Sequence, residues 1–169
     1  MLNHRGFTLI ELVMILVLLG ILAAFAVPRL GNVTATNAGA FTDKLRADIR
    51  YAQNLAMSQN RRYRVYFNAA PAPNPGYAVV NDADGNGTWG GAGEVARDHA
   101  GGGPLSVTLN AGQYAGITLS APGFAGNYVE FNSLGVPFDS AGALTVSRNV
   151  TVAPGGTTVT VTAQTGAVN

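Results

Sequence analysis

The sequence predicts an α+β fold in which one long N-terminal helix precedes antiparallel β-sheet. Three observations support this prediction. Residues 7–27 form an apolar run, residues 41–60 place apolar side chains at three- and four-residue steps, and the pattern after residue 60 changes to a period of two. A long helix followed only by strands is typical of proteins that pack the helix against one sheet.

The apolar run from Phe7 to Val27 has 21 residues, and Glu11 is its only charged residue. A helix of about 21 residues spans roughly 31 Å, close to the hydrocarbon thickness of a bilayer. No Ala-x-Ala cleavage site follows the run in a plausible place, and a secretory signal peptide has a shorter apolar core. We therefore expect residues 1–6 to be a leader and residues 7–30 to be a retained transmembrane helix.

Glu11 has no partner within this helix, because no Lys, Arg or His lies between Phe7 and Pro28. A carboxylate inside a membrane costs about 2.5 kcal/mol or more and usually marks a functional position. Its partner is therefore expected in another chain. Pro28 lacks a backbone donor and crowds the preceding turn, which predicts a helix kink.

Residues 6–12 (Gly-Phe-Thr-Leu-Ile-Glu-Leu), residues 20–24 and the pair Val27-Pro28 resemble the N-terminus of type IV pilins and type II secretion pseudopilins. The resemblance implies that a prepilin peptidase cuts between Gly6 and Phe7 and methylates the new N-terminus. It also implies that Glu11 contacts the N-terminus of a neighbouring subunit, and that Pro28 is the helix-kinking proline of that family.

Residues 31–60 are expected to continue the helix as an amphipathic second half, with a weak spot at Gly31–Thr34. Its apolar stripe comprises Phe41, Leu45, Ile49, Ala52 and Ala56, with Leu55 beside it. A separate helix starting at Thr42 is the alternative. Residues 61–169 are expected to form a β-rich domain with strands at 63–67, 77–80, 94–97, 106–109, 117–119, 128–131, 144–147, 150–152 and 157–162.

The β-rich part resembles the GspH/FimT group of minor pseudopilins and minor pilins. The resemblance rests on residues 52–56, Asn60-Arg61-Arg62, an acidic glycine loop before Gly93-Glu94, the segment Glu130-Phe131-Asn132 and the C-terminal Thr165-Gly166. Members of this group that take up DNA carry arginines after the final glycine. This chain has Ala167-Val168-Asn169 there, which argues against DNA binding through the C-terminus.

Composition excludes some chemistry. The chain has no cysteine, so it has neither disulfides nor a cysteine-based zinc site. Without the leader it carries nine basic and nine acidic residues, which gives no bulk electrostatic reason to bind nucleic acid. His99 is the only histidine outside the leader, and no residues are spaced as a catalytic triad or acid–base pair. We expect no enzymatic activity.

The segment Asp82-Ala-Asp-Gly-Asn-Gly87 matches the opening of a calcium-binding loop. Its candidate ligands are Asp82, Asp84, Asn86 and Glu94, although the twelfth position of the loop is Gly93 and Glu94 follows one residue later. A glycine-rich turn between strands explains the same residues, and this alternative is favoured.

A basic cluster falls within 21 residues and could form a phosphate-binding face: Lys44, Arg46, Arg50, Arg61, Arg62 and Arg64. Asp43 and Asp48 lie among these cations. A solvated helix surface is therefore the favoured interpretation, and nucleic acid is not an expected partner.

Together these features predict a minor pilin or pseudopilin of a type II secretion system or a type IV pilus. Its expected partners are other pilin subunits, the prepilin peptidase, the inner-membrane assembly platform and, before assembly, membrane lipid. The expected location is the bacterial inner membrane, with a periplasmic C-terminal domain, and then the filament. DNA uptake and calcium-dependent adhesion on a pilus are the alternative functions.

Overall fold

The computed structural model describes residues 8–169, with side-chain burial described for residues 8–24 and 34–169. A single helix, α1 (Leu9–Gln59), runs without interruption through Pro28 and Gly31. The predicted kink at Pro28 stays a prediction, and the continuous helix excludes a new one starting at Thr42. The described part of the chain holds no helix that is both long and apolar enough to cross a membrane.

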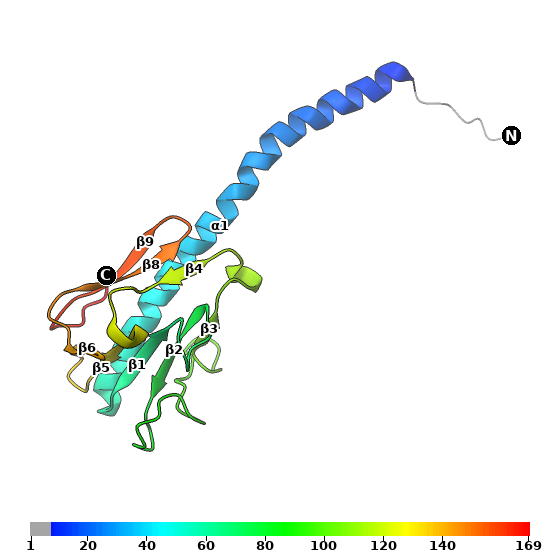
Figure 1. Ribbon diagram of the computed structural model, residues 1–169. Coiled ribbons are helices and arrows are strands. Elements are labelled where there is room, and N and C mark those ends of the chain that lie inside the picture. Colours follow the sequence, from blue (N-terminus) through cyan, green and yellow to red (C-terminus); the bar gives the residue numbers. More distant parts are fainter. Residues whose placement is uncertain (1–7) are drawn as a thin grey trace. The chain divides into compact units, whose positions relative to one another are not determined.

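Nine strands follow α1, interrupted by two short 3₁₀ helices, η1 (Gly112–Tyr114) and η2 (Ala125–Asn127). The strands form two antiparallel sheets, which Figure 1 shows beside the second part of α1. The larger sheet has the order β3-β2-β1-β5-β6-β7, and the smaller one has the order β4-β8-β9. Their bounds are β1 Tyr63–Phe67, β2 Gly76–Asn81, β3 Ser106–Thr108, β4 Thr118–Ser120, β5 Tyr128–Phe131, β6 Pro137–Asp139, β7 Gly142–Ala143, β8 Arg148–Ala153 and β9 Thr157–Val161. The predicted α+β class is confirmed.

Two predicted strands are wrong. Residues 94–97 form only isolated bridges, from Val95 to Val80 and from Arg97 to Pro104. Residues 144–147 are irregular, although Leu144 is buried. The structure instead forms a hairpin of β6 and β7, where no strand was predicted. Pro137 fits because it is the first residue of β6, a position that tolerates proline.

The chain divides into two compact units, Met1–Val33 and Thr34–Asn169. The boundary falls inside α1, so the second half of the helix belongs to the same unit as both sheets. This second unit is built around the stripe predicted from the sequence, since Phe41, Leu45, Ile49, Ala52 and Ala56 are all buried.

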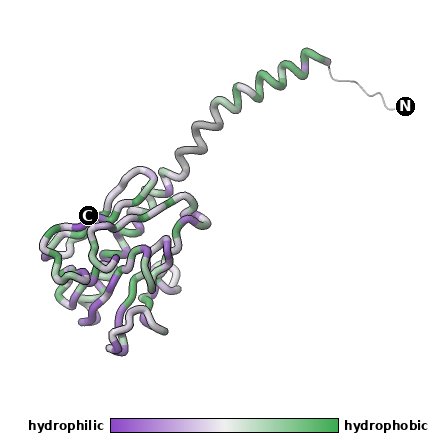
Figure 2. The backbone as a smooth tube through the Cα atoms, in the orientation of Figure 1, coloured by the Kyte–Doolittle hydropathy of each residue, from purple (hydrophilic) through white to green (hydrophobic). Residues whose placement is uncertain are grey.

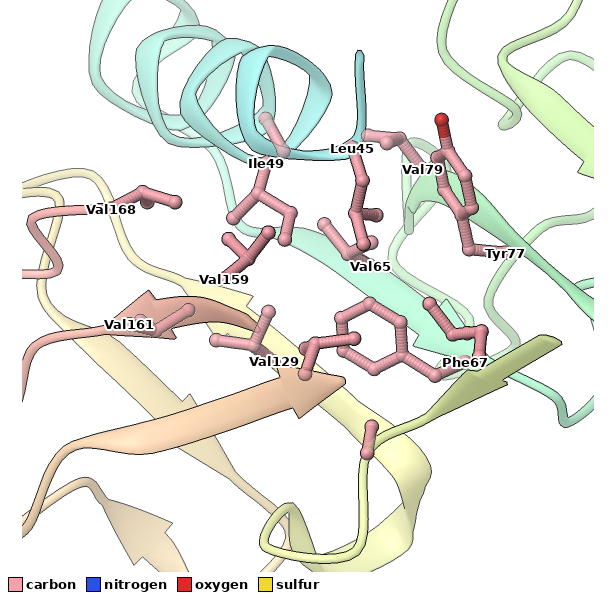
Figure 3. Close-up of a cluster of buried hydrophobic side chains, with 14 of the residues drawn as sticks. Leu45, Ile49, Val65, Phe67, Tyr77, Val79, Val129, Val159, Val161 and Val168 are labelled. Carbon is pink, nitrogen blue, oxygen red and sulfur yellow. The ribbon is translucent and has the colours of Figure 1, made fainter. Parts of the chain in front are cut away.

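The core of the second unit joins three layers. Leu45 and Ile49 of α1 face Val65 of the larger sheet and Val159 of the smaller one (Figure 3). The two sheets therefore share one hydrophobic core beneath the helix. A smaller cluster on the larger sheet contains Tyr66, Ala72, Ala78, Val80 and Tyr128, with Trp89 and Val95 packed against it.

Candidate functional site

The start of α1 is organised by Thr8 and Glu11. The Glu11 backbone N–H donates to Thr8 Oγ1 at 3.4 Å, and that hydroxyl donates to Glu11 Oε2 at 3.5 Å. The sequence Thr-x-x-Glu is the signature of a capping box, a feature that sequence reasoning missed. Glu11 thus has a local structural role in addition to its predicted role in assembly. Gly6 and Phe7, the predicted processing site, lie outside the described residues.

The first part of α1 exposes its apolar side chains. Every large hydrophobic residue from Leu9 to Leu22 is exposed, from 42% at Ile15 to 83% at Leu9. Figure 2 shows most of this stretch in the green of hydrophobic residues. Pro28 lies farther along the same helix, but its side chain is outside those described.

The predicted calcium loop brings three carboxylates together. Oxygen atoms of Asp82, Asp84 and Glu94 lie within 4.8 Å of one another. The side-chain amide of Asn86 donates to Asp84 Oδ2 at 2.7 Å, and its Oδ1 already accepts the Thr88 backbone N–H at 2.6 Å. Asp82 Oδ2 accepts the backbone N–H of Gly87 at 3.0 Å, whereas its Oδ1 is buried without a partner. The geometry therefore gathers three of the four predicted ligands.

Glu94 also holds the two ends of the loop together. Its side chain is buried and accepts backbone N–H groups from Ala83 at 2.7 Å, Asp84 at 3.4 Å and Gly91 at 2.8 Å. Hydrogen bonds to an ionised carboxylate are stronger than neutral ones. The buried carboxylate thus has a sufficient structural explanation as the centre of a turn.

Trp89 fixes the same loop to the outer face of the larger sheet. The guanidinium of Arg64 lies 3.8 Å from the ring centroid of Trp89 and 4.2 Å from that of Tyr128. Cation–π contacts of this kind contribute about 0.5–2 kcal/mol each. The loop therefore has two anchors, a carboxylate at its end and an indole in its middle.

Most of the predicted basic cluster is engaged within the protein. Lys44 pairs with Asp48 and Asp98, Arg46 pairs with Asp43, and Arg62 and Arg64 both bond to the buried Glu130. Arg50 donates twice to the Val168 carbonyl, at 2.9 and 2.6 Å. Arg61 differs, since its contact is a 3.5 Å bond to the Ala83 carbonyl. Five of these six cations thus have carboxylate or close carbonyl partners.

Sequence reasoning also missed a buried polar network between α1 and β2. Asp48 is fully buried, and its Oδ2 accepts the Tyr77 hydroxyl at 2.6 Å and the Lys44 ammonium at 3.0 Å. Burial and the neighbouring Asp48 raise the pKa of Tyr77 well above its usual range. Burial alone would lower the pKa of Lys44, but its hydrogen bond and charge interaction with Asp48 raise it above 10.5. Asp48 lies among surface residues in the helical pattern, which concealed its burial.

His99 is exposed in a turn after Asp98. Its ring packs at 5.2 Å from that of Tyr51, and its Nδ1 lies 3.8 Å from Asp98 Oδ1. This arrangement places an aromatic neighbour and one carboxylate beside the imidazole.

Comparison with known proteins identifies two sequence families along the chain. Residues 42–166 match the family described as type II transport protein GspH, and residues 1–27 match the prokaryotic N-terminal methylation motif. No curated protein sequence matches the chain.

Two solved structures are similar, and both are crystal forms of the type IV minor pilin FimU from Pseudomonas aeruginosa PAO1. One covers 80% of this chain and 90% of its own length at 14% identity, with a TM-score of 0.43. The other covers 82% and 87% at 14% identity, with a TM-score of 0.44. Because the family match spans most of the sequence, the chain belongs to the GspH family of minor pilins and pseudopilins, and its N-terminus carries the methylation motif.

Proposed function

We propose that this chain is a structural subunit of a type II secretion pseudopilus or a type IV pilus. A prepilin peptidase cuts it between Gly6 and Phe7 and methylates Phe7. The observation that carries the proposal is the combination, in one chain, of a methylation motif over residues 1–27 with a GspH match over residues 42–166.

The exposed apolar side chains of α1 support an order of events. Residues 9–22 have no cover from the rest of the described chain, and apolar patches of this size mark contacts with membrane or protein. Before assembly, lipid of the inner membrane covers them, with the β-rich unit in the periplasm. After extraction by the assembly platform, helices of other subunits take the place of the lipid.

Glu11 fixes the register between subunits in this proposal. The methylated amine of one Phe7 pairs with the Glu11 carboxylate of a neighbour in an apolar helix bundle. An ion pair is stronger there than in water, although desolvation cancels part of the gain. The pair therefore favours one axial offset between helices over slipped alternatives.

The capping interaction with Thr8 allows a sharp test, because Glu11→Gln keeps a hydrogen-bonding side chain at the third helical position but removes the charge. We expect both Glu11→Gln and Glu11→Ala to lower incorporation strongly, measured as the protein's share of sheared filaments against the membrane pool. Intact mass serves as the control: cleavage after Gly6 should be unchanged in both variants.

The assembly role and the helix-capping role of Glu11 predict different results for these two variants. If Glu11→Gln enters filaments as wild type does and Glu11→Ala does not, the residue acts only as a helix cap. If both variants enter normally, Glu11 makes no assembly contact in this subunit.

The alternative of calcium-dependent adhesion rests on the three carboxylates within 4.8 Å. Calcium that binds only the folded state would stabilise it, by about 2.7 kcal/mol at a Ca²⁺ concentration of a hundred times Kd. This stabilisation would raise Tm. If Ca²⁺ raises the Tm of the wild type but not that of Asp82→Asn, the loop binds a cation. If Tm is the same in Ca²⁺ and in chelator, the loop is a turn that needs no metal. Asp43→Asn, on an exposed face of α1, is the matched control.

The alternative of DNA uptake is less well supported, because ion pairs and carbonyl contacts engage most of the basic cluster. Any affinity should therefore be weak and sensitive to salt. Tight binding of duplex DNA at physiological salt, lost on Arg61→Ala, would reverse this order.

A further inference from the structure

An open groove with a volume of about 760 Å³ lies beside the C-terminal part of α1. Its walls come from the last turns of the helix, the end of β2 and the segment from Gly93 to Pro104. All of these residues belong to the unit Thr34–Asn169. The volume is in the range of about 300–1,000 Å³ that is typical of ligand sites.

Asn81 lines this groove and carries a buried polar atom with no partner. It continues the core-facing row of β2 after Tyr77 and Val79, yet it is polar and only 9% exposed. Its Nδ2 donates to the Tyr63 hydroxyl at 3.2 Å, whereas its Oδ1 is buried without a hydrogen bond. Leaving a buried acceptor unsatisfied costs about 1–3 kcal/mol.

The nearby groups do not satisfy this acceptor. The Tyr63 hydroxyl donates to Gln59 Oε1 at 2.7 Å, so its proton is engaged. Gln59, Tyr63 and Asn81 all line the groove, so this polar chain forms part of its wall.

The charge of the groove is positive. Arg61 and Arg97 line it and are exposed, and their bonds run only to backbone carbonyls, of Ala83 at 3.5 Å and Gly102 at 3.2 Å. No aspartate or glutamate lines the groove, and neither arginine forms an ion pair among the described residues. Two guanidinium groups without carboxylates favour an anionic occupant.

The other residues that line the groove favour a peptide over a nucleic acid as the occupant. Leu55, Ala96 and Pro104 provide aliphatic surface. The two aromatic residues are already packed, because the ring of Tyr51 contacts that of His99 at 5.2 Å and Tyr63 is only 3% exposed. Single-stranded nucleic acid needs free aromatic faces for base stacking. Free phosphate would satisfy the arginines but would leave the aliphatic surface uncovered.

We propose that this groove binds a short acidic and aliphatic peptide segment of a partner protein. Carboxylates of the peptide pair with Arg61 and Arg97, and an aliphatic side chain covers Leu55 and Pro104. The groove is a binding surface separate from Glu11, and its occupancy does not depend on the assembly role of that residue.

Fluorescence polarisation with the full chain in detergent tests this assignment. The probe is a fluorescein-labelled peptide, Glu-Leu-Asp-Val-Glu, compared with its neutral counterpart Gln-Leu-Asn-Val-Gln and with labelled oligo-dT. We expect the acidic peptide to bind best. The double variant Arg61→Gln/Arg97→Gln should raise its Kd about tenfold, because two ion pairs are lost.

Arg46→Gln is the matched control, since Arg46 pairs with Asp43 and does not line the groove. This variant should bind the acidic peptide as wild type does. In the full chain with ¹⁵N labelling, the side-chain amide signals of Asn81 should shift when the acidic peptide is added.

Three results would overturn the proposal. These are no detectable binding of the acidic peptide, equal binding of the neutral one, or an unchanged Kd in the double variant. Tighter binding of oligo-dT than of the acidic peptide would assign the groove to nucleic acid instead.

Discussion

Tyr77 and Lys44 bring two alkaline-titrating groups to one buried carboxylate, that of Asp48. The pKa values of both groups are raised in the folded state, above the ordinary 10.0 for Tyr77 and 10.5 for Lys44. A group with a raised folded pKa contributes stability that is complete below the unfolded value and is lost as pH rises through the folded one. The network therefore stabilises the fold at neutral pH and weakens above pH 10.

We predict that the urea midpoint of the wild type falls as pH rises above about 10, where the unfolded Tyr77 and Lys44 lose protons first. Tyr77→Phe should cost about 1.5–3 kcal/mol at neutral pH, because a hydrogen bond to a buried charge is lost. Its midpoint should also fall less steeply with pH, since the contribution of Tyr77 is then absent. A wild-type midpoint that is flat across this pH range would contradict the network.

Residue chemistry sets a limit on what the sequence could predict about the candidate sites. The loop carboxylates were predicted because Asp82 and Asp84 alternate along one short segment. The ion pairs of the basic cluster were not predicted, because Glu130 lies on a strand far along the chain from Arg62 and Arg64. Nothing in the sequence distinguished Asn81 as a buried residue, because polar residues are common at the ends of strands.

At the level of elements, Gln53 joins the end of α1 to two loops. Its side-chain amide donates to the carbonyls of Gly135 at 2.9 Å and Thr165 at 3.1 Å. Gly166 makes this close approach possible. It has a φ of +67°, and an added Cβ would lie 2.5 Å from the Gly135 carbonyl oxygen and 2.6 Å from Gln53 Nε2.

We predict that Gly166→Ala destabilises the fold by about 2 kcal/mol more than Gly156→Ala does, measured by urea unfolding. Gly156 is a matched control, because its φ is +62° but an added Cβ would meet nothing within 4 Å. The left-handed backbone destabilises both variants, whereas the collision of the new Cβ destabilises only Gly166→Ala. Equal losses in the two variants would show that the helix end separates readily from the loops.

The elements predicted correctly are those with strong local periodicity. The stripe from Phe41 to Ala56 and the β1 strand have spacing that only one secondary structure explains. The hairpin of β6 and β7 was missed because its strands are only three and two residues long, and its turn depends on Asp139, whose Oδ1 accepts the Ala141 N–H at 2.8 Å. Residues 144–147 alternate like a strand, yet Val146 is 53% exposed and has no neighbour to pair with.

For the whole molecule, the distribution of buried residues predicts independent folding of the second unit. The buried hydrophobic residues described begin at Ala38, and the exposed apolar run of α1 ends before it. We predict that a fragment of residues 34–169 is a monomer that unfolds cooperatively with heat. Size-exclusion chromatography and circular dichroism check this expectation. Aggregation, or a broad and non-cooperative transition, would mean that the first part of α1 is needed for folding.

The position of Trp89 has a practical consequence, because it is the only tryptophan in the chain. Its indole stacks on the Arg64 guanidinium at 3.8 Å, so its fluorescence depends on whether the loop rests against the sheet. Release of the loop would expose the indole to water and shift its emission to longer wavelength. The native protein therefore carries its own optical probe, with which loop opening can be timed in a stopped-flow instrument without attaching a dye.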